Sequence, residues 1–154
     1  MAKDAIELLK ADHEKVKELL NELTDTTTRA EKKRPQLLDE IEQELEIHTH
    51  LEEKIFYPAF KKAGNSNHDE LYFEAFEEHR VVSEFVLPDL KKTDPTSDKF
   101  SGRAKILKEL IEHHADEEEK DMFKKARQSL TAEELATLGE EMNQRKQELE
   151  SEKS

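Results

Sequence analysis

The sequence comprises 154 residues, which is about the size of one domain and enough to bury a hydrophobic core. It contains 41% charged and 34% hydrophobic residues and carries a net charge of −13. The absence of cysteine excludes disulfides, thiolate catalysis, iron–sulfur clusters and cysteine-ligated zinc. Because the acidic charge repels phosphate backbones, we expect no nucleic-acid partner.

The N-terminal residues are charged, and no apolar run approaches the ~20 residues that a membrane span requires. We therefore expect neither a signal peptide nor a membrane partner, and the cytoplasm is the expected location. The apolar residues recur at helical spacing, with only three glycines and four prolines in the whole sequence. This pattern favours an all-α protein over a disordered chain.

Four helices are expected before residue 130. The first covers about residues 3–28, and the second covers about residues 35–64, with Pro58 expected to kink it. The third and fourth cover about residues 69–91 and 98–127, and a polar linker separates them.

A fifth helix is expected after Thr131-Ala-Glu-Glu134, which has the sequence of a capping box. Its apolar stripe is thin, so we expect it to pack across the end of the bundle or to extend from it. The predicted organisation is thus a bundle over residues 1–130, followed by a C-terminal helix and tail over residues 131–154.

Polar residues interrupt the apolar stripes of the four bundle helices. On a helical wheel, the stripes are centred near four histidines, and Glu52 and Glu118 lie about 40° from the histidine that precedes each of them by four residues. Residues four apart share one helix face, so each His-x-x-x-Glu directs a nitrogen and a carboxylate to the same point. Such groups are costly to bury unless something binds them. The pattern therefore predicts a metal site formed by His13, His48, Glu52, His79, His114 and Glu118.

One offset of 66 residues relates the two halves of this set. It carries residue 13 to 79, 48 to 114 and 52 to 118. Two helical hairpins related by a pseudo-twofold axis would form an up-down-up-down four-helix bundle. Four imidazoles and two carboxylates then converge from opposite sides, which suits two metal ions bridged by the carboxylates better than one ion. The donor set favours iron, with manganese as an alternative; zinc and copper are also expected to bind in vitro.

These residues resemble a known family, the hemerythrin-like or HHE cation-binding domains. The resemblance covers about residues 3–127. It rests on Leu9-Lys-Ala-Asp-His13, His48-Thr-His-Leu-Glu52-Glu53-Lys-Ile-Phe-Tyr-Pro58, Glu77-Glu-His79 and His114-Ala-Asp-Glu-Glu118-Glu119. It implies a bundle holding two non-haem iron ions, with an oxo or hydroxo bridge allowed between them. The ligands it implies are His13, His48, Glu52, His79, His114 and Glu118.

Two positions depart from the oxygen-carrying hemerythrins. Ser83 stands where their third helix has a second histidine. Their fourth helix carries His-x-x-x-x-Asp, for which Glu119 would have to substitute, whereas Glu118 fits His-x-x-x-Glu. One imidazole fewer leaves coordination positions open and favours reactive chemistry over reversible oxygen carriage. Bacterial members with this pattern are associated with peroxide turnover, nitric oxide chemistry and iron handling under oxidative stress.

The expected function is therefore a di-iron protein that binds or reacts with H2O2, O2 or NO, as a peroxidase-like or catalase-like oxidoreductase. The alternative is a non-catalytic module that binds or senses iron, O2 or NO. A metal-free structural bundle that dimerises through the fifth helix is a third hypothesis. The apolar surroundings of the site are expected to admit small gases and exclude bulky substrates. The pattern identifies neither an electron donor nor an oligomeric state.

Several other polar residues have weaker expectations. Glu53 and Glu119 are expected beside the site or on the surface, not as ligands. His50 and His68 are expected in solvent, and Tyr57 is expected to point away from His48. The sequence leaves open the roles of Glu44 and Tyr72, and it gives the exposed-flank pair His113 and Glu117 little weight as a site.

Overall fold

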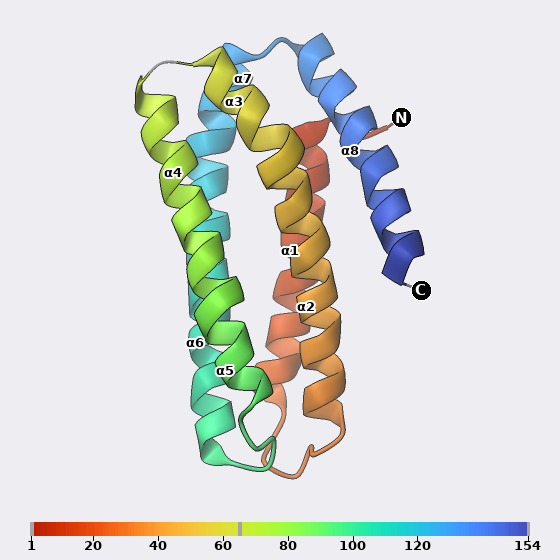
Figure 1. Ribbon diagram of the computed structural model, residues 1–154, viewed down its shortest axis with the longest axis vertical. Coiled ribbons are helices and arrows are strands. Elements are labelled where there is room, and N and C mark those ends of the chain that lie inside the picture. Colours follow the sequence, from red (N-terminus) through yellow and green to blue (C-terminus); the bar gives the residue numbers. More distant parts are fainter. Residues whose placement is uncertain (1, 65, 154) are drawn as a thin grey trace.

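The computed structural model describes residues 2–64 and 66–153, with side chains at all of these positions except 66 and 67. Four long helical columns stand side by side and alternate in direction, and a fifth helix runs beside them (Figure 1). This arrangement confirms the predicted all-α bundle with an additional C-terminal helix. The helical elements, in chain order, are α1 (Ala5–Asp25), α2 (Lys33–Leu51), η1 (Glu52–Phe56), α3 (Tyr57–Ala63), α4 (Ser66–Val81), η2 (Val82–Val86), α5 (Leu87–Lys91), α6 (Asp98–Glu117), η3 (Glu118–Met122), α7 (Phe123–Ser129) and α8 (Ala132–Lys153).

Side-chain caps fix where α1 and α6 begin. The Asp4 carboxylate accepts a hydrogen bond from the Glu7 N–H, and the Glu7 carboxylate accepts one from the Asp4 N–H, which completes a capping box. The Ser97 hydroxyl accepts from the Phe100 N–H at 3.1 Å. Both caps satisfy N–H groups that lack intrahelical partners and so set the register of the two helices.

Three of the four columns contain a five-residue π-helical segment in their second half. These are η1, η2 and η3, and each is continuous with the α-helical segments on both sides. Pro58 and Pro88 lie in the first turns of α3 and α5, directly after η1 and η2. Pro58 was expected to kink this helix just beyond the site, and the structure has a π-helical turn over Glu52–Phe56 directly before Pro58. A π turn adds a residue and rotates everything after it by about 100° relative to an unbroken α-helix.

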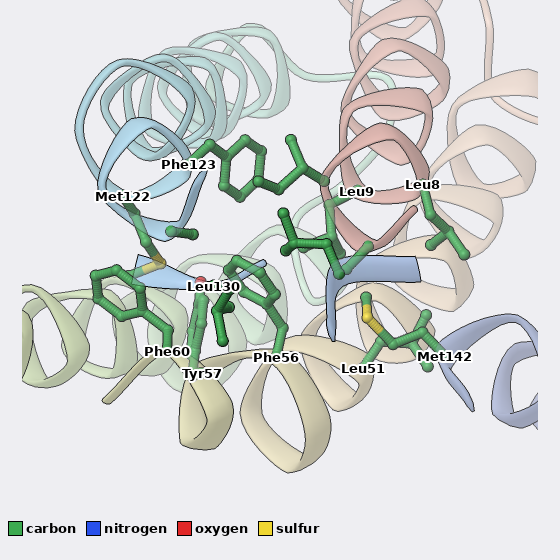
Figure 2. Close-up of a cluster of buried hydrophobic side chains, with 14 of the residues drawn as sticks. Leu8, Leu9, Leu51, Phe56, Tyr57, Phe60, Met122, Phe123, Leu130 and Met142 are labelled. Carbon is green, nitrogen blue, oxygen red and sulfur yellow. The ribbon is translucent and has the colours of Figure 1, made fainter. Parts of the chain in front are cut away.

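The buried apolar residues form two clusters, one on either side of the mid-length polar residues. Figure 2 shows the first, in which Leu9, Leu51, Phe56 and Phe123 meet from α1, α2, η1 and α7. The second lies towards the opposite end of the bundle and includes Val16, Ile41 and Leu107. Burial of these side chains in two clusters leaves the four histidines between them in a water-poor layer.

Helix α8 packs along the side of the bundle, against α1 and α2, and not across its end (Figure 1). Leu135 and Met142 are buried in the first apolar cluster. Gly139 allows the close approach, because a Cβ at this position would lie 2.5 Å from the Lys3 carbonyl oxygen. The helix returns from Leu130 towards the middle of the bundle, which brings its polar face near the histidine layer.

Candidate metal centre

The structure brings all six predicted residues together at mid-length of the bundle. His13 lies on α1, His48 on α2, His79 on α4 and His114 on α6. Glu52 and Glu118 are the first residues of η1 and η3. Five of the six are buried, and the His114 side chain is 14% exposed.

Each carboxylate lies between imidazoles from both hairpins. Glu52 Oε1 is 3.1 Å from His48 Nε2 and 3.2 Å from His79 Nε2. On the other side, Glu118 Oε1 is 3.2 Å from His13 Nε2, and Glu118 Oε2 is 3.4 Å from His114 Nε2. The pseudo-twofold relation seen in the sequence thus holds in space, and the two carboxylates are the shared members of the cluster.

A second layer of carboxylates contacts the outer nitrogen, Nδ1, of each of the four histidines of the cluster. The Nδ1 atoms contact Glu119 from His13 (2.7 Å), Asp12 from His48 (3.0 Å), Glu53 from His79 (2.7 Å) and Glu78 from His114 (2.7 Å). An acceptor at Nδ1 keeps the proton there, so the Nε2 lone pair of a neutral ring faces the centre. The 66-residue offset also relates these four carboxylates in pairs, 12 to 78 and 53 to 119.

Several of the innermost atoms of the cluster have unsatisfied hydrogen-bonding capacity. Among the described residues, the buried atoms without a hydrogen-bond partner are His13 Nε2, His48 Nε2, Glu118 Oε1 and both Glu52 carboxylate oxygens. Their mutual approaches lack hydrogen-bond geometry. Buried polar atoms without partners are destabilising, and here they are all metal-ligating types that face one another. The donor set therefore fits the cation that the sequence predicts.

The charges in the cluster shift its protonation strongly. Burial lowers the pKa of His48, but Glu52 and Asp12 outweigh it and raise the value to about 10. Burial also opposes protonation of His79 and His114, yet Glu52 and Glu53 raise the pKa of His79, and Glu118 and Glu78 raise that of His114. Burial would raise the pKa of Glu118, but its neighbours, among them His114 and His13, hold it well below the usual range. The cluster thus favours charged carboxylate beside protonated imidazole.

Tyr57 corrects a sequence-based expectation. It was expected to point away from His48, but it is fully buried, and its hydroxyl donates to Glu118 Oε2 and lies 3.3 Å from His79 Nε2. Burial, followed by the Glu118 charge, raises the pKa of Tyr57 well above its usual value, so the phenol keeps its proton. Its counterpart in the other hairpin is Phe123, which stacks on His13 as Tyr57 stacks on His79. The hydroxyl is thus a local departure from the pseudo-twofold symmetry.

Other polar residues that the sequence singled out lie outside the centre. Glu44 pairs with Lys15 at 2.7 Å, and Tyr72 packs against Tyr57 in an aromatic group on α4. His50 is half-buried and accepts a hydrogen bond from Arg145. His68, expected in solvent, is instead buried and stacks on Phe60 with its ring centroid 4.0 Å away.

Helix α8 contributes a cation to the second layer. Lys146 Nζ lies 2.7 Å from Asp12 Oδ1, while the other Asp12 oxygen holds His48. Lys146 thus acts on a histidine of the cluster through Asp12. Sequence reasoning missed this contact, since the direction of α8 decides which of its lysines meets the bundle.

We expect Lys146→Met to weaken metal binding by about 3–10-fold, less than the ~10–100-fold typical of losing a residue that directly holds a ligand. Without the ammonium group, Asp12 interacts more strongly with a protonated His48, which then competes better with the cation. The measurement is competitive metal titration with a chelator. Lys153→Met is the matched control, because Lys153 pairs with Glu46, which is 55% exposed. Equal affinities for the two variants would contradict this role of Lys146.

The fold and the site define a helical bundle with a buried histidine and carboxylate cluster of cation-binding type. The chain belongs to the hemerythrin HHE cation binding domain family, whose model matches residues 4–126. This result confirms the family resemblance found in the sequence. It also means that α8 lies beyond the matched region.

Similar proteins come from mycobacteria and a cyanobacterium. An uncharacterized Mycobacterium tuberculosis protein, Rv2633c, is 30% identical over 147 residues, covering 95% of this chain and 87% of its own. The crystal structure of its Mycobacterium kansasii homolog, an HHE cation binding domain-containing protein, matches with a TM-score of 0.85 and 31% identity over 97% of this chain and 89% of that one. A protein named DNA nickase from Nostoc is 27% identical over 82% of this chain, which spans 34% of that protein.

None of the described helices is long and apolar enough to cross a lipid bilayer.

Proposed function

We propose that His13, His48, Glu52, His79, His114 and Glu118 bind two iron ions and that the loaded centre reacts with H2O2, O2 or NO in the cytoplasm. The observation that carries the proposal is the position of Glu52 and Glu118, each of which reaches imidazoles of both hairpins. Carboxylates in this position suit a pair of divalent ions, whose mutual repulsion bridging anions reduce. A mixed nitrogen and oxygen donor set suits iron.

The protein groups would hold and orient the ions, while bound iron would supply the electrons for reduction of an oxidant. The four outer carboxylates keep the Nδ1 protons in place, so that Nε2 remains available as a donor atom. Tyr57 keeps its proton at the edge of the centre, within reach of Glu118 and His79. The two apolar clusters restrict water around this layer.

The similarity to the Nostoc protein does not favour an activity on DNA for this chain. The chain spans about a third of that protein, and its net charge of −13 opposes phosphate binding. We therefore propose no nucleic-acid partner and no membrane partner. A role in oxidative or nitrosative stress, or in iron handling, follows from the proposed chemistry.

The test combines metal analysis with rapid mixing. Protein loaded anaerobically with Fe²⁺ is expected to retain two ions per chain and to change its near-ultraviolet absorption after mixing with H2O2, O2 or NO. Rapid decay to an oxidised centre indicates turnover, whereas a long-lived adduct indicates a binding module. His114→Ala should lose both the ions and the signal, and His50→Ala should lose neither. Retention of less than one ion by the unmodified protein would refute the proposal.

A further inference from the structure

We propose that the cavity beside the histidine cluster binds an apolar organic molecule with one small oxygen-bearing end, a class that includes alkyl hydroperoxides and alcohols. All four helical columns line the cavity, and the four histidines of the cluster face it together with mainly apolar side chains. This inference deepens the proposed function, because it names the kind of molecule that would reach that site.

The size of the cavity exceeds what a diatomic gas needs. Its volume is about 230 Å³, whereas one water molecule requires only ~10–15 Å³ of comparable space. The expectation that the apolar surroundings exclude bulky molecules therefore does not hold on this side of the centre. A molecule of about ten non-hydrogen atoms has room beside the imidazoles.

The side chains that line the cavity favour a ligand that is mainly apolar. Val16, Leu45, Val82, Leu87 and Ile111 line the cavity and leave mainly the imidazoles as polar groups near the centre. Hydrocarbon that packs against these side chains is removed from contact with water, which is favourable by roughly 25 cal/mol per Å² of buried apolar surface. A small hydroxyl or hydroperoxyl end is the part that suits the imidazole edges.

The carboxylates that line the cavity already have partners. Glu42, Glu46 and Glu78 line it, and no lysine or arginine of the described chain does so. Lys91 and Lys153 pair with Glu42 and Glu46 from outside this lining. Glu78 holds His114 through Nδ1 at 2.7 Å. All three carboxylates are thus paired, so the lining that remains to contact a ligand is mainly apolar.

Ser83 connects the cavity to the departure seen in the sequence. It lies on η2, is exposed and lines the cavity. The oxygen-carrying hemerythrins that this chain resembles have a histidine at this position. A side chain as small as serine leaves this space open. A large side chain at 83 should block the cavity without disturbing the core, because the position is exposed.

The test measures binding and needs no turnover. Full-length ¹⁵N-labelled protein, metal-free and loaded with redox-inert zinc, is titrated with cumyl alcohol. We expect saturable shifts at the amides of Val82 and Ile111 below about 10 mM alcohol. Ser83→Phe and Leu110→Phe should each weaken alcohol binding at least tenfold, whereas Glu84→Phe, an exposed neighbour that does not line the cavity, should change it less than twofold.

Absence of saturable shifts, or unchanged binding in both blocked variants, would overturn the inference. These outcomes are separable from the proposed function. If the alcohol fails to bind while the iron-loaded protein reacts with oxidants, only the cavity assignment is wrong. If the alcohol binds while the iron-loaded protein reacts with none of them, the proposed function is wrong and the binding site stands.

Discussion

Glu52→Ala is expected to reduce the metal content from two ions per chain to less than one and to remove the stabilisation that metal gives the fold. Both Glu52 oxygens are buried without hydrogen-bond partners, and Oε1 approaches imidazoles of two different helices. Loss of this carboxylate therefore affects both proposed ion positions at once. At a free metal concentration 1,000-fold above the dissociation constant, the lost stabilisation is about 4 kcal/mol.

Metal analysis and calorimetric unfolding, each with and without added metal, measure the two effects of this substitution. The difference between Glu52→Ala and the unmodified protein should be large with metal and smaller without it, because most of the loss is binding energy. Glu44→Ala is the matched control on α2, since Glu44 pairs with Lys15 at the surface. Two retained ions in Glu52→Ala would show that this carboxylate is not a shared ligand.

Helical periodicity was enough to predict which residues face the interior. His13, His48, His79 and His114 each lie on an apolar stripe, and a straight helix up to that point turns each of them into the bundle. The 66-residue offset added the pairing of the two hairpins. That these residues ligate metal stays a prediction, but their convergence is a property of the structure.

Periodicity failed where the helices are not α-helical. Tyr57 lies nine residues after His48, and a uniform 100° per residue places it on the opposite side of the helix. The π-helical segment η1 lies between them and rotates the chain after it, which brings the Tyr57 hydroxyl to Glu118. Each of η1 and η3 begins with a glutamate, which is a common residue in this chain. The sequence pattern alone therefore does not predict the extra residue of the π-helical turn.

The sequence also could not predict contacts that depend on how the helices pack against one another. Asp12 lies next to His13 in the chain, yet it holds His48 on the neighbouring helix. His13 in turn is held by Glu119, which comes from the other hairpin. Several acidic residues flank each histidine, and only the packing of α1 against α2 and α6 decides which one meets which ring.

Metal binding is expected to release protons at neutral pH and to become tighter as pH rises. In the metal-free protein the pKa of His48 is about 10 and that of His114 is well above its usual value, so these two rings are mainly protonated at pH 7; the pKa of His79 is also raised. A cation binds only neutral imidazole, and each displaced proton makes the apparent affinity rise about tenfold per pH unit. Zinc titrations by calorimetry at pH 7, in buffers of different ionisation enthalpy, should show release of at least one proton per chain.

The raised pKa of His48 also predicts how the stability of the metal-free protein depends on pH. The unfolded chain loses a histidine proton near pH 6.5, whereas the folded protein keeps that of His48 up to about pH 10. Its contribution to stability is therefore complete below pH 6.5 and is lost as pH rises towards 10, at roughly 1.4 kcal/mol for each unit of pKa difference. Urea unfolding from pH 6 to 10 measures this loss, and it should be smaller in Asp12→Asn, which removes one of the two charges that raise the pKa of His48. A metal-free protein whose stability is constant over this range would mean that His48 is neutral in the folded state and that no proton stands where the cation binds.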